Sequence, residues 1–594
     1  MSLVGHEYPV LVVGGGPIGL LSAYMLAKLG GNLTVETLLI EKYPQRLAAP
    51  KAHVICPRSL EICRQYGLDT NSMRKIGSPR DEAYWVNFLT NLSGKLIGNL
   101  PFERMDPGVL ESVPEMIHNI PQPSFEQFIL AEILHSCPEV DMRKNLAFVS
   151  CEQDGDSVIS LLEDRSSKTQ LRIKSKHVVA CDGAKSQVRK FLGIESEGED
   201  VYDTMMTIHF KADLRPVVKE RVGTLHWIID PACSGFIIAY DLSGDHVLIN
   251  NFDAKKQPSE TWTPDIAKAV VSAAIGQDIP LEILSFRPWV LSRKVAKEYR
   301  RGNVFLVGDA VHAFPPTGGL GLNTGIADAH NLAYKLAAVH RGSASDFLLQ
   351  TYEAERRPVA LRAASQSVKN GKRIFSFLRN LGAANIGDLV KARANLYQTV
   401  YDPTKQQMIS EGVEEQREHF NNLGIHIGYI YGSTDLSNDA SLFTPKFVVG
   451  ARLPHAWIRL LNLNRQHTGI IPIDVSYVKE LPREKVKKWQ YSTLDLCSFQ
   501  CFTLITSSRQ SWSSRCKALA EALGQWGVRI EMRAADCDFE FVEPIQRELF
   551  NQGAAMNEGG ALLVRPDQHI LGCLSPETNF LDLVTLVKSH LGLC

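Results

Sequence analysis

The length and charge balance of the chain exclude several classes of protein. The chain has 594 residues, of which 44% are hydrophobic and 22% charged, a composition typical of a folded protein of about three domains. Lys and Arg number 64 and Asp and Glu 65, so the formal net charge of −1 does not favour nucleic acid as a partner. No apolar run approaches the ~20 residues that span a bilayer, and no secretory signal opens the sequence. We therefore expect a cytoplasmic protein without a transmembrane segment.

The cysteines give no sign of a metal or redox centre. The 12 cysteines are scattered and form no C-x-x-C pair. This excludes zinc-ribbon and thioredoxin-type spacings, so we expect reduced thiols and no metal site.

The first 41 residues have the pattern of a strand, a tight turn, a helix and a second strand. An apolar run at 10–13 leads into Gly14, Gly16 and Gly19, and apolar residues then recur at helical spacing. In a G-x-G-x-x-G turn the first glycine permits the turn, the second lets a pyrophosphate approach the backbone, and the third lets helix and strand pack closely. The free N–H groups of the helix N-terminus attract the phosphates. The motif predicts a bound dinucleotide.

Glu41 ends the second strand, which is expected at 34–40. It lies about twenty residues after the third glycine, where a carboxylate accepts hydrogen bonds from the adenosine ribose. The alternative is a solvated glutamate at a strand end.

The middle of the chain changes from the helical to the alternating period. A hairpin turn, NLSG, lies at 91–94, and a helix at 125–134 and a buried strand at 177–180 follow. From about 203 the apolar residues alternate, first over 206–214, as in a half-buried strand. This block of antiparallel sheet offers a wall for a substrate. Its other strands are expected at 225–229, 236–240 and 246–250, with a turn at 242–245.

The α/β pattern then resumes. A strand at 303–307 precedes a Pro–Gly loop and a helix at 326–339, and residues 353–422 are charged and helical. A polar stretch near 432–445 is the best linker candidate. Beyond it we expect a small α/β unit with strands at 502–506 and 561–564 and a helix at 515–526.

Two further motifs place acidic residues at strand ends. CDGAKSQVR at 181–189 contains Asp182 and Gly183, and GDAVHAFPPTGGLGLNTGIADAHNLAYKL at 308–336 contains Asp309. A carboxylate at the end of a strand can bind the hydroxyls of a ribityl chain. The alternatives are an ordinary Asp–Gly turn for Asp182 and a helix or turn cap for Asp309.

With the glycine turn and Glu41, these motifs make the sequence resemble the single-component FAD-dependent aromatic hydroxylases, the p-hydroxybenzoate hydroxylase-like family. PKAHVICPRSLEI at 50–62 and GARLPHAWI at 450–458 resemble its phenol hydroxylase branch. The resemblance covers essentially the whole chain. It implies an α/β fold with an α+β insert, in three parts: a Rossmann-like FAD-binding domain (1–80, 101–202 and 291–430), an inserted substrate-binding sheet (81–100 and 203–290) and a thioredoxin-like domain (446–594).

The resemblance and the residue chemistry together give a set of FAD-binding candidates. Prolines fix the loop at 315–323, and its glycines let backbone N–H groups reach the flavin ring. The positive end of the following helix, which starts near Leu322, would stabilise negative charge on reduced flavin. The candidates are Gly14, Gly16, Gly19, Glu41, Asp182, Gly183, Asp309, Pro316, Gly319, Gly321, Leu322 and Asn323.

Three more candidates lie near the suspected flavin edge. The resemblance places Gln122 beside the flavin, and a solvated glutamine is the alternative. Lys51 and Arg58 would bind FAD or remain surface charges.

His53 is the candidate catalytic residue. It stands in AHV at 52–54, where the phenol hydroxylase branch carries an acidic group in the active site. Its unperturbed pKa near 6.5 suits deprotonation of a phenol, and the alternative is a packed histidine. Tyr240 is the second catalytic candidate, and His226 and Trp227 are candidate substrate contacts. Their strand parity is open, because a shift of one residue reverses the face.

The C-terminal unit carries SSRQ at 507–510, where a redox-active thioredoxin turn would carry C-x-x-C. Cys497 and Cys501 precede the strand with the wrong spacing, so we expect them to pack rather than exchange disulfides. The domain would then be structural and would support a homodimer.

The resemblance implies an FAD-dependent monooxygenase with tightly bound FAD and transient NADPH or NADH. A C4a-hydroperoxide of the flavin would hydroxylate a phenolic or aromatic small molecule with O2. Since a second G-x-G-x-x-G unit is missing, the nicotinamide cofactor is expected to bind only transiently, as a co-substrate. The alternatives are a Baeyer–Villiger or epoxidising monooxygenase, a flavoprotein dehydrogenase that does not use O2, and a non-catalytic FAD-binding protein.

Overall fold

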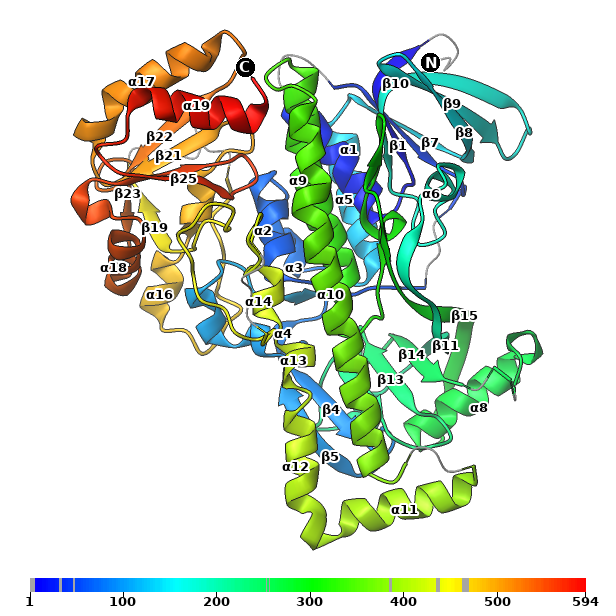
Figure 1. Ribbon diagram of the computed structural model, residues 1–594. Coiled ribbons are helices and arrows are strands. Elements are labelled where there is room, and N and C mark those ends of the chain that lie inside the picture. Colours follow the sequence, from blue (N-terminus) through cyan, green and yellow to red (C-terminus); the bar gives the residue numbers. More distant parts are fainter. Residues whose placement is uncertain are drawn as a thin grey trace.

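The computed structural model describes residues 6–30, 35–45, 49–252, 254–255, 257–383, 387–433, 438–461 and 470–593. The expected start of the second strand at Thr34 and residues 434–437 of the expected linker lie outside this set. Figure 1 shows two sheets on one side of a pair of long helices and a C-terminal unit on the other side.

The first sheet carries the glycine turn. Strands β17, β10, β1, β2 and β7 run parallel in that order, and β16 pairs antiparallel with β17. Strands β1 and β2 are mostly apolar, as expected for strands buried on both faces of a sheet. The bounds are β1 Glu7–Val13, β2 Thr37–Glu41, β7 Val140–Lys144, β8 Leu146–Asp154, β9 Ser157–Asp164, β10 Gln170–Ala180, β16 Arg300–Arg301 and β17 Val304–Leu306.

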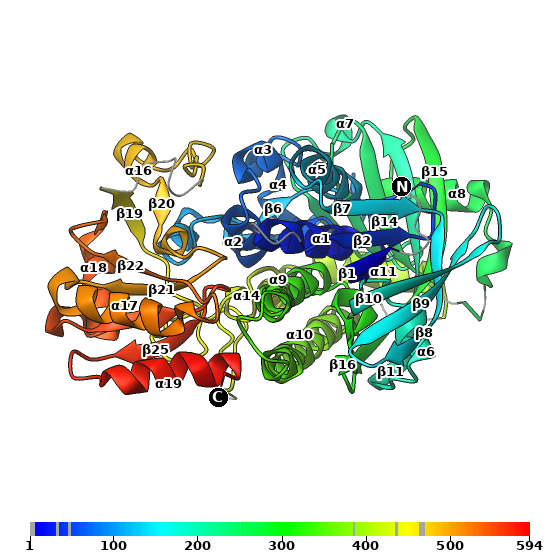
Figure 2. The same ribbon diagram turned by 90° about the horizontal axis from the view of Figure 1, so that it is seen from above.

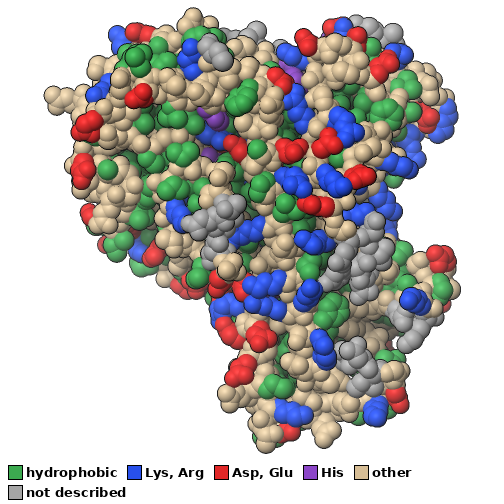
Figure 3. All heavy atoms as spheres, viewed as in Figure 1, with side chains coloured by type: hydrophobic (Ala, Val, Ile, Leu, Met, Phe, Trp, Pro, Cys, Tyr) green, Lys and Arg blue, Asp and Glu red, His purple; other side chains and the backbone are tan. Residues whose placement is uncertain are grey.

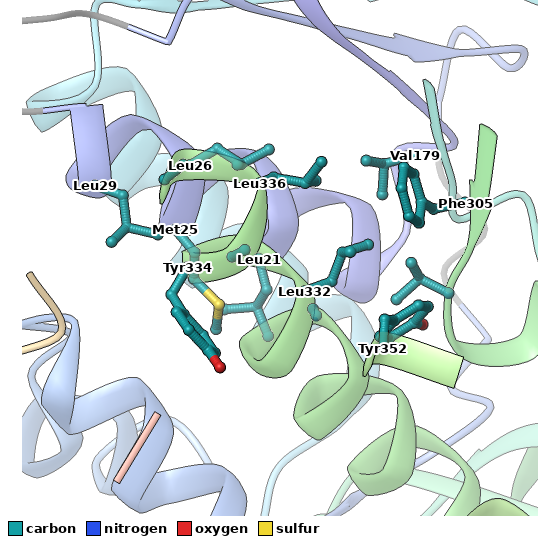
Figure 4. Packing of buried hydrophobic residues seen from close by; sticks show 14 of the residues in the cluster. Leu21, Met25, Leu26, Leu29, Val179, Phe305, Leu332, Tyr334, Leu336 and Tyr352 are labelled. Atoms are coloured by element: carbon teal, nitrogen blue, oxygen red, sulfur yellow. The ribbon is translucent and has the colours of Figure 1, made fainter. Parts of the chain in front are cut away.

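Helices α1 and α9 pack together against this sheet. Leu21 and Met25 of α1 meet Leu332 and Tyr334 of α9 in one buried cluster (Figure 4). Burial of each such apolar side chain contributes roughly 1.5–3 kcal/mol. This packing fixes the N-terminus of α9 relative to the glycine turn. The bounds are α1 Pro17–Gly30, α5 Gln122–Ser136, α9 Leu320–His340 and α10 Phe347–Asn380.

The second sheet is built mostly from the segments predicted for the insert. Its strand order is β18-β15-β11-β14-β13-β12-β4-β5, and all of its neighbours are antiparallel except β12 and β4. The hairpin predicted around 91–94 is confirmed by the antiparallel pairing of β4 with β5. The bounds are β4 Trp85–Leu89, β5 Leu96–Pro101, β11 Ser196–Ala212, β12 Leu225–Ile228, β13 Gly235–Ala239, β14 Asp245–Asn251, β15 Leu281–Ala296 and β18 His312–Ala313.

The two faces of this sheet pack differently. Met206, Ile208 and Phe210 lie in one buried cluster with α8 (Pro264–Ile275), which confirms the predicted alternation. The opposite face packs against α10 and the helices that follow it. Strands β11 and β15 continue past the predicted boundaries at 203 and 290 into the first unit.

Short elements complete the region between the sheets. They include a two-stranded pairing of β3 (Val54–Ile55) with β6 (His118–Asn119). The remaining helices are α2 Pro57–Gln65, α3 Thr70–Arg74, α4 Arg80–Ala83, α6 Gln187–Phe191, α7 Arg215–Val218, α11 Leu389–Tyr401, α12 Gln406–Glu414, α13 Arg417–Phe420 and α14 Leu423–His426.

The C-terminal unit has its own four-stranded sheet, in the order β22-β21-β24-β25. Strands β21 and β24 match their predicted bounds, while α17 begins six residues earlier than predicted. The bounds are β19 Trp457–Leu460, α16 Arg483–Lys488, β20 Tyr491–Ser492, β21 Phe502–Thr506, α17 Arg509–Gly524, β22 Ile530–Ala534, β23 Phe539–Phe541, α18 Pro544–Gly553, β24 Ala561–Val564, β25 Ile570–Leu574 and α19 Phe580–Leu591. Seen from above, α9 and α10 separate this unit from the two other sheets (Figure 2).

The surface agrees with the near-zero net charge. Acidic and basic side chains lie interspersed over the face in Figure 3. Within the ranges that the structure describes, no helix combines the length and the apolar character needed to cross a bilayer.

Candidate functional site

The carboxyl ends of four parallel strands meet at one edge of the first sheet. Val13 of β1 pairs with Ala180 of β10 and Ile40 of β2, and Ala180 pairs with Leu306 of β17. The residues that follow these positions therefore lie next to one another. They are Gly14, Asp182, Asp309 and Glu41, from motifs separated by almost 300 residues.

The glycine turn leaves no room for side chains. Gly14 has φ +109°, and a Cβ there would lie 2.5 Å from the carbonyl oxygen of Cys181. A Cβ on Gly19 would lie 1.8 Å from the carbonyl oxygen of Gly14, because α1 begins directly against the strand end. Gly16 accepts the first helical bond from the N–H of Leu20, 2.9 Å away. The backbone N–H groups of this turn form a cradle suited to a pyrophosphate.

Glu41 lies against this turn. Its carboxylate accepts the N–H of Gly15 at 2.9 Å through Oε2 and the N–H of Tyr43 at 2.9 Å through Oε1. These bonds fix a buried carboxylate where the ribose of a dinucleotide would lie. The ribose contact itself stays a prediction.

Asp182 serves the local structure. Its carboxylate accepts the hydroxyl of Ser186 at 2.5 Å and the N–H groups of Gln187 and Val188 at 2.7 and 3.2 Å. These bonds stabilise the N-terminus of α6, so they favour the alternative of an ordinary turn. Gly183 has φ +83° and no neighbour within 4 Å of a built Cβ, so the turn is open on that side.

Asp309 is the acidic residue most available to a ligand. It lies in η4 (Gly308–Ala310), is exposed, and has no hydrogen-bond partner in the described part of the chain. Its Oδ1 lies 4.0 Å from the position of a Cβ built on Gly321, in the first turn of α9. The carboxylate therefore stands beside a helix N-terminus, where a ribityl chain could bind.

The Pro–Gly loop leads directly into α9. Gly318 and Gly319 have φ +93° and +65°, and the N–H of Gly319 binds the carbonyl of Pro316 at 3.0 Å. The helix begins at Leu320, two residues before the predicted Leu322. The first N–H groups of a helix have no partner within it, so the loop exposes donors and a positive dipole end. This geometry fits a flavin ring.

The side chain of Asn323 is fully engaged within the protein, and its predicted FAD contact stays a prediction. Its Oδ1 accepts the N–H of Cys56 and the hydroxyl of Ser59, and its Nδ2 donates to the carbonyls of Val54 and Gly319. All bonding positions of the amide are used. Asn323 fastens the start of α9 to the segment that carries the candidate catalytic histidine.

Arg58 is a correction. Its buried guanidinium donates through Nη1 to Glu61 and Gln568, at 3.1 and 2.6 Å, and through Nη2 to the carbonyl of Asp567 at 3.0 Å. The side chain therefore joins α2 to the C-terminal unit instead of FAD.

Lys51 and Gln122 lie at the edge of the site. Lys51 is exposed. The N–H of Gln122 binds the carbonyl of Ala52 at 2.9 Å, and its Nε2 donates to Glu126 at 2.8 Å. Gln122 thus lies beside the segment that carries His53, and its flavin contact remains a prediction.

Of the three candidate residues from the second sheet, two share a face and one does not. Trp227 and Tyr240 belong to the buried cluster between the second sheet and α10. His226 points to the other face, where Nε2 lies 2.9 Å from the carbonyl of Gly223. The prediction for His226 is wrong because adjacent strand residues face opposite ways.

His53 meets this cluster at its edge. Its ring lies edge-on to Tyr240 with centroids 5.8 Å apart, and Nδ1 lies 2.8 Å from Oδ1 of Asn119. Burial lowers the pKa of His53 to about 4, and the bond to Asn119 offsets this only in part. Burial also raises the pKa of Tyr240, so its hydroxyl stays protonated. A neutral imidazole and a phenolic hydroxyl thus lie together.

Sequence reasoning missed the residues that support this site. Asn119 holds His53 from 66 residues away, and no local pattern signals it. His312 serves local structure: its Nε2 lies 2.9 Å from Oδ2 of Asp328, and Arg356 binds the other carboxylate oxygen at 2.7 Å. Among the described residues, no cluster of three potential metal ligands is present.

This fold and site define a dinucleotide-binding flavoprotein. The FAD binding domain family matches residues 7–367. The chain is 27% identical to tetracenomycin A2 monooxygenase-dioxygenase of Streptomyces glaucescens, over 95% of this chain and 92% of that protein. It is 28% identical to 2,4-dichlorophenol 6-monooxygenase of Cupriavidus pinatubonensis, over 99% and 96%.

A solved structure is similar over the full length. The flavin-dependent monooxygenase PieE, in complex with FAD and substrate, superposes with a TM-score of 0.84 at 24% identity and covers 100% of both chains. At this identity the likeness concerns the fold alone. The chain belongs to the FAD binding domain family, and FAD is its cofactor. It is an FAD-dependent monooxygenase.

Replacing Asp309 with Asn tests its place in the FAD site. We expect FAD to bind at least about ten-fold more weakly, since charge-assisted hydrogen bonds to ribityl hydroxyls are lost. The melting temperature of the FAD-free protein should not change, because Asp309 has no partner among the described residues. FAD titration measures both forms. Asp265→Asn on α8 is the matched exposed control, and equal FAD affinity in the two variants would remove Asp309 from the site.

Proposed function

We propose that this monooxygenase hydroxylates a phenolic or aromatic small molecule with NAD(P)H and O2. The observation that carries the proposal is the position of His53 and Tyr240 at one end of an aromatic cluster, beside the segment bound to the start of α9. The names of the two relatives support it, since both are oxygenases and one acts on a chlorinated phenol. The apolar lining would position an aromatic ring and keep out water.

The cofactor and the protein have separate tasks. When bound and reduced by NAD(P)H, FAD would supply the chemistry that transfers one oxygen atom of O2 to the ring. The glycine turn, Glu41 and Asp309 are proposed to hold the adenosine and ribityl parts. The backbone N–H groups at 320–322, in the first turn of α9, are proposed to hold the ring. NADPH or NADH would bind transiently, as a co-substrate.

His53 is proposed to take the phenolic proton. Because Oδ1 of Asn119 accepts a hydrogen bond from Nδ1, the proton lies on Nδ1 and Nε2 carries the lone pair. Nε2 has no hydrogen-bond partner in the described part of the chain. The Tyr240 hydroxyl is proposed to donate a hydrogen bond to the substrate oxygen.

The pH profile tests the role of His53. A histidine with a lowered pKa is neutral above that pKa, so the base is available from about pH 5 upward. The acid limb of kcat/KM that belongs to His53 should therefore lie near 4 instead of 6.5. His53→Phe should lose about 100-fold in kcat, with His135→Ala as an exposed control. Unchanged hydroxylation by His53→Phe would refute the role.

Coupled turnover tests the proposed function. The purified yellow holoenzyme is mixed with NADPH or NADH, and the consumption of nicotinamide and O2 is measured with and without a panel of phenols. We expect at least one phenol to accelerate both rates together. No acceleration by any phenol would contradict the proposal, and nicotinamide oxidation without O2 uptake would favour a dehydrogenase.

Location and assembly complete the proposal. We propose a cytoplasmic site of action, where NAD(P)H is supplied, and a homodimer supported by the C-terminal unit. Cell fractionation and light scattering of the pure protein test these two points.

A further inference from the structure

One deeply buried arginine side chain differs from others in its lack of a counter-charge among the described residues. Arg58, Arg104 and Arg356 are among the largest fully buried side chains of the described residues. Arg58 has Glu61 as a counter-charge, and Arg356 has Asp328. Arg104, which is 1% exposed, contacts no carboxylate in the described ranges. An unpaired buried charge is costly, so such a residue calls for a reason.

The neighbours of Arg104 are neutral. Its Nε donates to the carbonyl of Phe420 at 2.8 Å, and its Nη1 lies 3.2 Å from Nδ1 of His426. Burial and, to a smaller extent, the charge of Arg104 lower the pKa of His419 to about 3, so this ring is neutral. The positive charge is thus left uncompensated on the protein side.

Arg104 lies next to the candidate catalytic site. Arg104 belongs to η1 (Glu103–Met105), and its backbone carbonyl accepts the N–H of Ile117 at 3.4 Å. Ile117 directly precedes β6, and Asn119 of β6 binds His53. Arg104 binds the segment that runs from Phe420 at the end of α13 to His426 in α14. This segment lies along α10 (Figure 1) and reaches the Pro–Gly loop. There Nδ2 of Asn422 donates to the carbonyl of Gly318 at 3.2 Å.

Aromatic rings and unpartnered polar atoms lie in or beside the same buried cluster. The ring of Phe102 lies 5.3 Å from the guanidinium carbon, and Trp227 lies edge-on to His419 with centroids 5.5 Å apart. Nε1 of Trp227, Oη of Tyr240 and Nδ1 of His419 are buried without a hydrogen-bond partner in the described part of the chain. Buried polar atoms are normally paired, so unpaired atoms around one apolar cluster point to a ligand that pairs them.

We propose that Arg104 is the counter-charge for an aromatic anion, a phenolate or an aryl carboxylate, bound in this cluster. The proposal rests on the proposed function and deepens it, because it assigns the ionised form of the substrate to a named residue. The flat guanidinium suits a planar anion, and the aromatic walls suit its ring. A bound phenolate is also the electron-rich form that an oxygen transfer needs.

Equilibrium binding without turnover tests the proposal. The holoenzyme is titrated, in the absence of nicotinamide, with 4-nitrophenol, 4-nitrobenzoate and the neutral 4-nitroanisole, at a pH where the phenol is ionised. The change in FAD absorbance gives each dissociation constant. We expect at least one anion to bind about ten-fold or more tightly than 4-nitroanisole. Preference for the phenol or for the benzoate distinguishes the two anions.

Variants assign the preference to the charge. Arg104→Gln should bind anion and neutral ether alike, while Arg104→Lys, which keeps the charge, should retain part of the preference. Arg80→Gln is the matched control, because Arg80 donates to the neighbouring carbonyl of Met105 but is paired with Glu480. It should keep the full preference.

The outcomes separate this proposal from the proposed function. No binding, equal binding of the three probes by the wild type, or a preference that survives in Arg104→Gln would overturn the role of Arg104. If Arg104→Gln does not fold, the proposal is tested by the wild-type titrations together with those of Arg104→Lys. Coupled turnover of a phenol could still succeed in each case, so failure here leaves the hydroxylase proposal standing.

Discussion

Gly19→Ala should yield a protein that no longer retains FAD. A Cβ at this position would lie 1.8 Å from the carbonyl oxygen of Gly14, far inside any contact that a real Cβ makes. Because the obstacle is backbone at the glycine turn, the turn itself must shift. We expect the absorbance of bound flavin to be lost on purification and stability to fall by about 3 kcal/mol. Flavin absorbance and thermal melting measure the two effects.

Gly371→Ala is the matched control. Gly371 lies inside α10, and a Cβ there meets nothing within 4 Å. Alanine is the better helix former by up to about 1 kcal/mol, so this variant should keep FAD and be at least as stable as the wild type. A yellow, stable Gly19→Ala protein would show that the glycine turn does not bind the cofactor in the predicted way.

Arg356→Met should destabilise the protein by about 3–5 kcal/mol, since it leaves the buried carboxylate of Asp328 without its cation. Burial by itself raises the pKa of Asp328, but Arg356 and then His312 outweigh it and hold that pKa below its usual value. The loss of Arg356 also removes its bonds to Tyr431 and to the carbonyl of Thr324. Chemical unfolding of holoenzyme and variant measures the difference.

A double variant separates charge from packing. Arg356→Met combined with Asp328→Leu removes both charges and should recover a substantial part of the loss. Arg459→Ala, which breaks an exposed ion pair with Glu540, should leave the melting temperature unchanged. A loss in Arg356→Met no larger than in Arg459→Ala would contradict the account of this buried pair.

The elements that sequence reasoning predicted best are those with a strong local pattern. The alternation at 206–214 and the apolar runs at 502–506 and 561–564 reappear with little change, because each strand is defined by its own apolar residues. The length of β11 and β15 was not predictable. Their outer residues are partly polar, and pairing between residues 69 to 100 positions apart decides where the two strands end.

The candidate site was predictable where backbone chemistry decides. Gly14, Gly19 and Gly319 lie where a side chain would clash or a positive φ is needed, and this requirement is visible in the sequence. Side-chain roles were harder. Asn323 and Arg58 stand within or near the FAD motifs, yet their partners come from α2 and from the C-terminal unit, which only the tertiary fold brings close.

The alternation of side chains along a strand explains the wrong prediction for His226. His226 and Trp227 are neighbours, so one of them had to face away from the cluster, and the sequence did not indicate which. Arg104 gave no signal at all, because an arginine in a polar loop resembles a surface charge. Its burial and its lack of a carboxylate partner become visible only when 420–426 folds over it.

Oxygen labelling tests the central claim most directly. The holoenzyme is supplied with NAD(P)H, ¹⁸O₂ and a phenol that accelerates nicotinamide oxidation, and the product is analysed by mass spectrometry. The account predicts one ¹⁸O atom in each product molecule for each nicotinamide oxidised. An oxidised product without label, formed while NAD(P)H is consumed, would contradict it.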